Sequence, residues 1–130
     1  MRSETNLDKV REFHKAFGLD LDHKISVGSQ KSVELIKFRG TLIDEEYHEF
    51  LEAYYTDDTA EEIDACFDMM WVIVGYMKSR GWDCEQIWDE GAKSNLSKID
   101  PTTGKVRRRE DGKILKPDGW QPPDFSKFVK

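Results

Sequence analysis

The sequence predicts an all-α protein: a four- to five-helix bundle with an acidic helical hairpin and a mostly irregular C-terminal arm. Three observations support this fold class. Apolar residues recur at helical spacing in four segments before residue 98, as Ile63, Phe67, Met70 and Val74 do. Only a short turn separates the two longest segments, which favours an antiparallel pair. After Lys98 the helical period stops and turn-forming residues become frequent.

The helices and their ends follow from this pattern. The four predicted helices cover, in order, residues 7–17, 32–55, 60–80 and 84–97. Gly18 is expected to cap the first helix at its C-terminus, and a loop should follow it up to residue 32. Asp58 or Thr59 is the expected N-cap of the third helix, with Asp57 and Asp58 as turn residues, and Gly81 should end that helix.

The C-terminal arm is predicted to contain two turns. The first is Asp100–Gly104, and the second is Asp111–Gly112, which closes a small hairpin. Farther along, Trp120 and Phe125 flank two prolines, a composition typical of an extended segment that packs on the body or on a neighbouring subunit. We therefore expect residues 1–98 to form the helical domain and residues 99–130 to be a C-terminal arm of the same domain.

Charge is divided unevenly along the chain. Residues 1–97 contain 21 acidic and 11 basic side chains, a balance of −10. Residues 98–130 contain 5 acidic and 9 basic side chains, a balance of +4. An acidic body argues against nucleic acid as a partner. It suits a small anionic ligand held between metal ions and basic side chains. The alternative is a solvated acidic surface followed by a disordered basic tail.

Size and hydropathy narrow the class of protein further. A chain of 130 residues, 38% hydrophobic and 35% charged, predicts one small helical domain that completes its core by oligomerising. There is no apolar run of transmembrane length and no signal-peptide core, so we expect a cytoplasmic protein without a membrane partner. Cys66 and Cys84 form no disulfide framework, and Cys66 is expected to be buried.

Carboxylates are the residues that point to chemistry. Eleven of them lie between Asp44 and Asp68, in a stretch without a single Lys or Arg. On a helical wheel Glu45, Glu49 and Glu52 lie within about 60° of one another, and Glu46 lies to one side. Repulsion makes such clusters costly unless cations neutralise them, and hard divalent ions take oxygen ligands. We predict a cage for two or more Mg²⁺ or Mn²⁺ ions, with the ligands Glu45, Glu46, Glu49, Glu61, Asp64 and Asp68.

A cage of this kind is suited to phosphoryl chemistry. Metal ions a few ångströms apart activate water and stabilise the charge that develops on a phosphoryl group. Glu49 or Glu46 is the expected general base for that water. Arg39, upstream of the acids, either reaches a phosphate or pairs with a carboxylate at the surface. The alternative for the whole cluster is a non-catalytic acidic helical module that binds a partner protein.

These residues also carry a resemblance to a known family. The pattern E-E-x-x-E at Glu45–Glu49, followed by E-x-x-D at Glu61–Asp64, resembles the all-α NTP pyrophosphatase superfamily. Its members include MazG-like proteins, dimeric dUTPases and phosphoribosyl-ATP pyrophosphohydrolases. The segment Val10–Gly18 is similar to the opening of small MazG-like proteins, many of them phage-encoded. The resemblance covers most of the chain and continues through residues 61–75, 88–90, 94–98, 111–113 and 122–124.

The resemblance implies an activity: Mg²⁺-dependent hydrolysis of a nucleoside triphosphate to the monophosphate and pyrophosphate, in a homo-oligomer, either a dimer or a tetramer. It implies that Asn95 and Lys98 hold phosphate oxygens, with Lys113 and Lys116 as further candidates. Lys93 stands where relatives often carry Arg. The substrate we expect is a deoxynucleotide such as dGTP, with a dUTPase-like or phosphoribosyl-ATP-cleaving activity as the alternative. A phage-encoded protein would act in the host cytoplasm.

Overall fold

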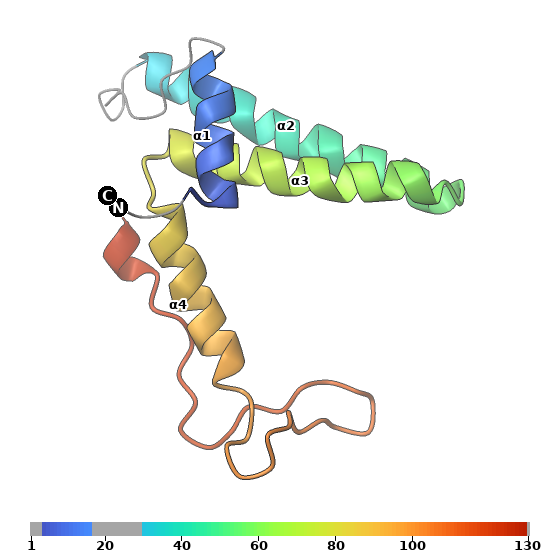
Figure 1. The fold of residues 1–130 in the computed structure, drawn as a ribbon, viewed down its shortest axis with the longest axis vertical. Coiled ribbons are helices and arrows are strands. Elements are labelled where there is room, and N and C mark those ends of the chain that lie inside the picture. The colour runs from blue at the N-terminus through green and yellow to red at the C-terminus, as the bar shows by residue number, and fades with distance from the viewer. Residues whose placement is uncertain (1–3, 17–29, 130) are drawn as a thin grey trace. The chain divides into compact units, whose positions relative to one another are not determined.

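The computed structural model describes residues 4–16 and 30–129, with the backbone alone for residues 30–32. This part of the chain contains four α-helices, a 3₁₀ helix and no strand, which confirms the all-α class (Figure 1). The elements are α1 (Asn6–Ala16), α2 (Gln30–Tyr55), α3 (Thr59–Ser79), α4 (Cys84–Leu96) and η1 (Ser126–Phe128). The predicted cap Gly18 and the loop before α2 lie outside the described residues. No described helix is both long and apolar enough to cross a membrane.

The chain divides into two compact units, residues 1–84 and residues 85–130. The first unit contains α1, α2 and α3. The second contains α4, except for its first residue, and the C-terminal arm. The expected organisation, one domain with an arm that begins at residue 99, stays a prediction.

Helices α2 and α3 form the antiparallel hairpin that the sequence predicts (Figure 1). Near the turn, the small buried residues Ala53 and Ala65 line one cavity. Farther along, carboxylates of Glu46 and Asp68 approach each other. Near the other end, a Cβ placed on Gly40 would lie 3.9 Å from the ring of Tyr76. This register holds the acids between the helices, about midway along the hairpin.

The turn between α2 and α3 is fixed by two neighbouring aspartates. Asp57 adopts a left-handed conformation with φ 56°, which Asp tolerates better than most residues. The backbone N–H of Asp58 donates to the carbonyl oxygen of Ala53 at 3.1 Å. Oδ1 of Asp58 accepts from the N–H of Glu61 at 3.2 Å, so Asp58 is the N-cap of α3. The prediction that both aspartates serve the turn is confirmed.

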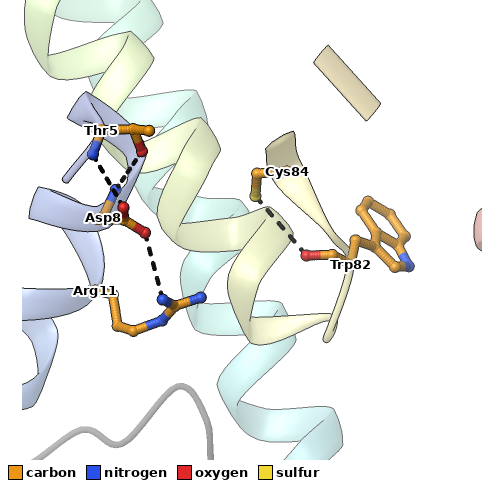
Figure 2. Close-up of polar contacts among 5 residues, drawn as sticks. All are labelled: Thr5, Asp8, Arg11, Trp82 and Cys84. Carbon is orange, nitrogen blue, oxygen red and sulfur yellow. Dashed lines mark hydrogen bonds and ion pairs between the residues drawn. The ribbon is translucent and has the colours of Figure 1, made fainter. Parts of the chain in front are cut away.

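Helix α3 ends as expected at Gly81, whose φ of 76° requires a residue without a side chain. The N–H of Gly81 donates to Lys78 O at 2.9 Å and the N–H of Trp82 donates to Met77 O at 3.1 Å. This pair of bonds is a Schellman motif, which satisfies carbonyls that the helix end would leave unpaired. Immediately after it, Cys84 Sγ contacts Trp82 O at 3.8 Å (Figure 2).

Helix α1 begins with a reciprocal cap. Thr5 Oγ1 accepts from the N–H of Asp8 at 3.2 Å, and Asp8 Oδ2 accepts from the N–H of Thr5 at 3.0 Å. Figure 2 shows this pair together with Arg11, whose Nη1 lies 3.4 Å from Asp8 Oδ1. Two N–H groups that the helix cannot satisfy are bonded in this way, and the cap fixes the start of α1.

Helix α1 packs on α3 through a buried histidine (Figure 1). His14 is 2% exposed, and its Nδ1 lies 2.7 Å from the carbonyl oxygen of Val10 one turn earlier. A Cβ placed on Gly75 would lie 3.1 Å from Cε1 of His14 and 3.3 Å from its Nε2. A side chain at position 75 would therefore require the imidazole to shift by a few tenths of an ångström.

Much of the apolar surface of α2 and α3 faces solvent in the single chain. Ile63, Phe67 and Met70 recur at helical spacing on α3 and are 67%, 51% and 62% exposed. Tyr47 and Tyr54 of α2 are also about half exposed. Cys66 lies among these residues and is exposed, so the expectation that it is buried was wrong. A helix can be apolar on a face that its own chain does not cover.

In the second unit, the arm packs on α4 through hydrogen bonds. Nε1 of Trp120 donates to Ser94 O at 3.1 Å. Glu90 accepts from the N–H of Asp124 at 3.1 Å and from Nζ of Lys127 at 2.9 Å. Both hydrogen bonds reach across more than thirty residues of sequence. The arm is irregular, as predicted, but it is held in place.

Both predicted turns of the arm are confirmed. The N–H of Gly104 donates to Asp100 O at 2.8 Å, which closes the first turn. At the second turn, the N–H of Arg109 donates to Lys113 O at 2.8 Å. Isolated antiparallel bridges join Ile99 to Val106 and Arg108 to Ile114, so the hairpin is too short to form a named strand.

Replacing Gly75 with Ala should destabilise the first unit by about 1–3 kcal/mol, because the new methyl group crowds the buried His14 ring and forces it to shift. The matched control is Gly40→Ala on α2, where the nearest atom lies at 3.9 Å and helix propensity should add about 0.5–1 kcal/mol. Urea unfolding measures both free energies. Equal effects of the two substitutions would contradict the close packing of His14 on Gly75.

Candidate metal centre

The structure brings together four of the acids that the sequence singled out. Glu46 and Glu49 come from α2, and Asp64 and Asp68 come from α3. One carboxylate oxygen each of Glu46, Glu49 and Asp68 lies within 4.8 Å of the other two. Asp64 is hydrogen-bonded to Asp68 and also raises the pKa of Glu46 by its charge. Four carboxylates from two helices therefore share one small volume.

The carboxylate group of Glu46 is at the centre of this cluster. Burial, followed by a hydrogen bond and the charge of Glu49, raises the pKa of Glu46 to about 7. Burial and the neighbouring Asp64 likewise raise the pKa of Asp68. Oε2 of Glu46 is buried and has no hydrogen-bond partner in the described part of the chain. The raised pKa values reflect burial and neighbouring negative charge, and the unpaired oxygen lacks a donor among the described residues.

This group of residues fits a hard divalent cation. Carboxylate oxygens are the ligands that Mg²⁺ and Mn²⁺ take, and the buried, unpaired oxygen of Glu46 lacks the partner that a cation would supply. A bound cation would also relieve the repulsion that raises the pKa of Glu46 and Asp68. The number and identity of the ions stay predictions.

An acid-lined cavity of about 240 Å³ lies beside the cluster, toward the turn of the hairpin. Glu49 and Asp64 belong to both the cluster and the cavity. The predicted ligand Glu61 lines the cavity, and so does Glu52. Glu52 shares a side of the helical wheel with Glu49 but was not among the predicted ligands. The remaining lining residues are Ala53, Thr56, Asp58 and Ala65.

Glu45 is exposed and is not one of the three residues whose oxygens approach within 4.8 Å. The helical wheel grouped Glu45 with Glu49 and set Glu46 aside, whereas the structure turns Glu46 toward α3. Arg39, Glu46 and Ala53 are spaced by seven residues and therefore lie along one side of α2. The assignment of Glu45 as a metal ligand stays a prediction.

Four of the residues predicted to hold phosphate lie in the second unit, and two of them, Lys98 and Lys116, lie near the ring of Trp120. Nζ of Lys98 donates to Oδ1 of Asn95 at 3.0 Å. The ammonium groups of Lys98 and Lys116 lie 5.4 Å and 4.5 Å from the centre of the Trp120 ring. Lys113 stands apart, in the exposed turn of the arm hairpin. The phosphate-binding roles of all four stay predictions.

Arg39 belongs to the first unit and is 6% exposed. Its burial lowers its pKa. Two of its nitrogens, Nε and Nη2, are buried and have no hydrogen-bond partner among the described residues. The alternative of a surface ion pair is therefore wrong, because the side chain is buried.

Fold and site together define a class of protein. An all-α chain that gathers carboxylates between two antiparallel helices has the architecture of the all-α NTP pyrophosphatases, the superfamily of the MazG-like proteins. The family model described as phosphoribosyl-ATP pyrophosphohydrolase matches residues 10–95, about two thirds of the sequence, and the chain belongs to this family. A search of curated proteins finds no match.

The raised pKa of Glu46 predicts how stability depends on pH. Without metal, folded Glu46 holds its proton up to a pH of about 7, whereas the unfolded side chain loses it near 4.5. The free energy of unfolding should therefore fall by about 2 kcal/mol as pH rises through this interval. Magnesium should reverse the slope, since it binds the deprotonated carboxylates.

Thermal or urea unfolding between pH 4.5 and 7.5, with EDTA or with Mg²⁺, measures this dependence. His14 acts in the opposite direction, because burial and the charge of Arg39 lower its pKa, so its contribution is lost at low pH. The variant Glu46→Gln keeps His14 and isolates the effect of Glu46. Identical pH profiles for this variant and the wild type would contradict the assignment.

Proposed function

We propose that this protein is a metal-dependent nucleoside triphosphate pyrophosphohydrolase. It cleaves a (deoxy)nucleoside triphosphate, dGTP being our candidate, between the α- and β-phosphates to the monophosphate and pyrophosphate. One observation carries the proposal: the oxygens of Glu46, Glu49 and Asp68 converge within 4.8 Å, inside the segment that matches a pyrophosphohydrolase family. A group of oxygens that could hold a divalent ion inside the matched segment supports this proposal.

Each carboxylate has a proposed role. Glu46, Glu49, Asp64 and Asp68 hold Mg²⁺ or Mn²⁺, and Glu61 extends the ligand set into the adjoining cavity. When bound, the ions supply Lewis-acid stabilisation of phosphoryl charge. Glu49 is exposed and so is accessible to a water molecule, and it accepts the proton of the attacking water. Glu46 is the alternative base, since its carboxyl group is hydrogen-bonded to that of Glu49 and so lies beside the same water.

Phosphoribosyl-ATP is the second candidate substrate, because the description of the matching family names it. Its cleavage releases pyrophosphate from the same kind of bond, so the carboxylates would have the same roles. The two candidates differ only in what surrounds the α-phosphate. A direct comparison of substrates therefore separates them without any change to the assignment of Glu49.

Pyrophosphate release with Mg²⁺ across the eight common NTPs and dNTPs and phosphoribosyl-ATP tests the activity. We expect turnover of a deoxynucleotide, and Glu49→Gln should lower kcat at least about 100-fold because the proton acceptor is lost. The matched control is Glu12→Gln, an exposed glutamate of α1 outside the cluster, which should leave kcat unchanged. Full activity of Glu49→Gln would remove Glu49 from the base role, and no turnover of any substrate would reject the enzyme.

The proposed enzyme is a homo-oligomer, a dimer or a tetramer. The support is the exposed apolar stripe Ile63, Phe67 and Met70 on α3, with Tyr47 and Tyr54 on α2. Monomeric proteins seldom expose contiguous apolar surface of this kind, and a second copy would remove it from water. A chain with few buried apolar side chains gains a larger core in this way.

Sedimentation equilibrium tests the assembly. The wild type should sediment as a dimer or tetramer, and Phe67→Lys should shift it to monomer at micromolar concentration, because a charge cannot be buried cheaply in an apolar interface. Val129→Lys is the matched control, at a residue that is 77% exposed in the second unit. A monomeric wild type, or an unchanged assembly of Phe67→Lys, would contradict this interface.

A further inference from the structure

The first unit contains a buried arginine with two unpaired hydrogen-bond donors. Arg39 is 6% exposed, and its Nε and Nη2 have no hydrogen-bond partner among the described residues. These two nitrogens are on the same side of the guanidinium, so their two N–H groups are parallel and point in the same direction. The carbon centre of this guanidinium lies 5.8 Å from the centre of the Phe38 ring. A buried cation with unsatisfied donors is costly unless two acceptors reach it.

His14, which feels the charge of Arg39, is neutral at pH 7. Burial lowers the pKa of His14, the hydrogen bond to Val10 opposes this, and the charge of Arg39 lowers the pKa further. Since the carbonyl of Val10 can only accept, Nδ1 of His14 carries the proton. A site for a phosphate would be expected to gather several cations, whereas the residue whose pKa the charge of Arg39 lowers is a neutral imidazole.

The surroundings of His14 are aromatic. The ring of Phe13 lies edge-on to His14 at 5.6 Å and edge-on to Trp71 at 5.3 Å. Aromatic side chains with few polar groups form the walls that flat, largely apolar ligands occupy. A nucleobase combines a flat face with a polar edge, so it suits aromatic side chains together with a pair of directed donors. His14 links the two, since it contacts Phe13 and its pKa is lowered by the charge of Arg39.

Arg39 is also at a suitable place along α2. It precedes Glu46 by seven residues, so it lies on the same side of the helix and about 10 Å away along the axis. A nucleotide whose α-phosphate is bound at the carboxylate cluster extends its sugar and base over a comparable length. The acid cluster and Arg39 can therefore contact opposite ends of one nucleoside monophosphate moiety.

We propose that the Nε and Nη2 groups of Arg39 read the base of the substrate by donating to two adjacent acceptors, the O6 and N7 atoms of guanine. This assignment rests on the proposed function and adds the residue that selects the base. Arginine binds the O6/N7 edge of guanine in this bidentate way, whereas adenine offers N7 beside a donor, N6, which would face an N–H of Arg39. Adenine nucleotides are therefore disfavoured.

Substrate analogues test the contact atom by atom. The test compares kcat/KM for dGTP, dITP, 7-deaza-dGTP and dATP. dITP keeps O6 and N7 and should be cleaved within about threefold of dGTP. 7-deaza-dGTP lacks the N7 acceptor and should be cleaved about ten- to hundredfold less efficiently, as should dATP. Equal kcat/KM for dGTP and 7-deaza-dGTP in the wild type overturns the proposal.

The variant Arg39→Lys keeps the charge and loses the paired donors. It should lower kcat/KM for dGTP about ten- to hundredfold and change that for 7-deaza-dGTP less than threefold, so that the preference disappears. Arg80→Lys, at an exposed arginine that follows α3, is the matched control and should keep the preference. An equal loss for all four nucleotides would show that Arg39 binds phosphate or only supports the fold, and would overturn the proposal.

The base contact can still be tested if the variant does not fold or if the protein cleaves no nucleotide. If Arg39→Lys does not fold, the comparison of dGTP with 7-deaza-dGTP in the wild type decides alone. If the wild type cleaves no nucleotide, the proposed function has failed, and calorimetric binding of dGMP against 7-deaza-dGMP then decides the base contact. Tenfold or greater preference for dGMP supports the contact, and equal affinity or no binding rejects it.

Discussion

Repulsion among the carboxylates between α2 and α3 is the constraint on which the first unit depends. Three of their oxygens lie within 4.8 Å of one another. At an effective dielectric constant of about 20, two unit charges at that distance repel by roughly 3 kcal/mol. The charge of Arg39 is not among the influences on the pKa of Glu46 or of Asp68, so it does not compensate for this repulsion. Protonation of Glu46 is one way to relieve the repulsion, and a cation at ligand distance is the other.

The packing at the two ends of the hairpin forces the acids together in spite of this cost. Near the turn, the capping aspartate Asp58 fixes the start of α3, and Ala53 and Ala65 are buried. Toward the other end, His14 of α1 occupies the space beside Gly75. The acids lie between these two fixed points and cannot move apart without disturbing one of them. A cation that binds only the folded protein would stabilise it by mass action, so stability and metal affinity are linked.

Local features of the sequence predicted the fold well. Helix ends depend on short-range hydrogen bonds, and this is why Asp58 and Gly81 could be assigned from residue type and position. The acid clusters could be found because repulsion makes them unusual in any sequence. What the sequence could not supply was the rotation of α2 about its axis. The wheel placed Glu46 to one side, and only the packing of α3 shows that this side faces the partner helix.

The same limitation applies to burial. Cys66 has the size and polarity of a core residue, yet it lies on a face of α3 that its own chain does not cover. Arg39 has the character of a surface residue, yet α2 turns it inward. The exposure of Cys66 and the burial of Arg39 have one physical origin: a helix presents several faces, and long-range contacts decide which of them is buried. A charged residue on the buried side, such as Arg39, is therefore more informative about ligands than an apolar one.

In the proposed site, the carboxylates of α2 and Arg39 of the same helix have different roles. The carboxylate cluster can recognise only what all nucleoside triphosphates share, because a divalent ion binds phosphate oxygens regardless of the base. Discrimination among bases requires directed donors or acceptors, and leaving them unpaired is costly when the wrong base binds. Arg39 has such donors two helical turns from Glu46, far enough that its hydrogen bonds do not compete with the carboxylates. One helix can in this way carry both the chemistry and the selectivity of the enzyme.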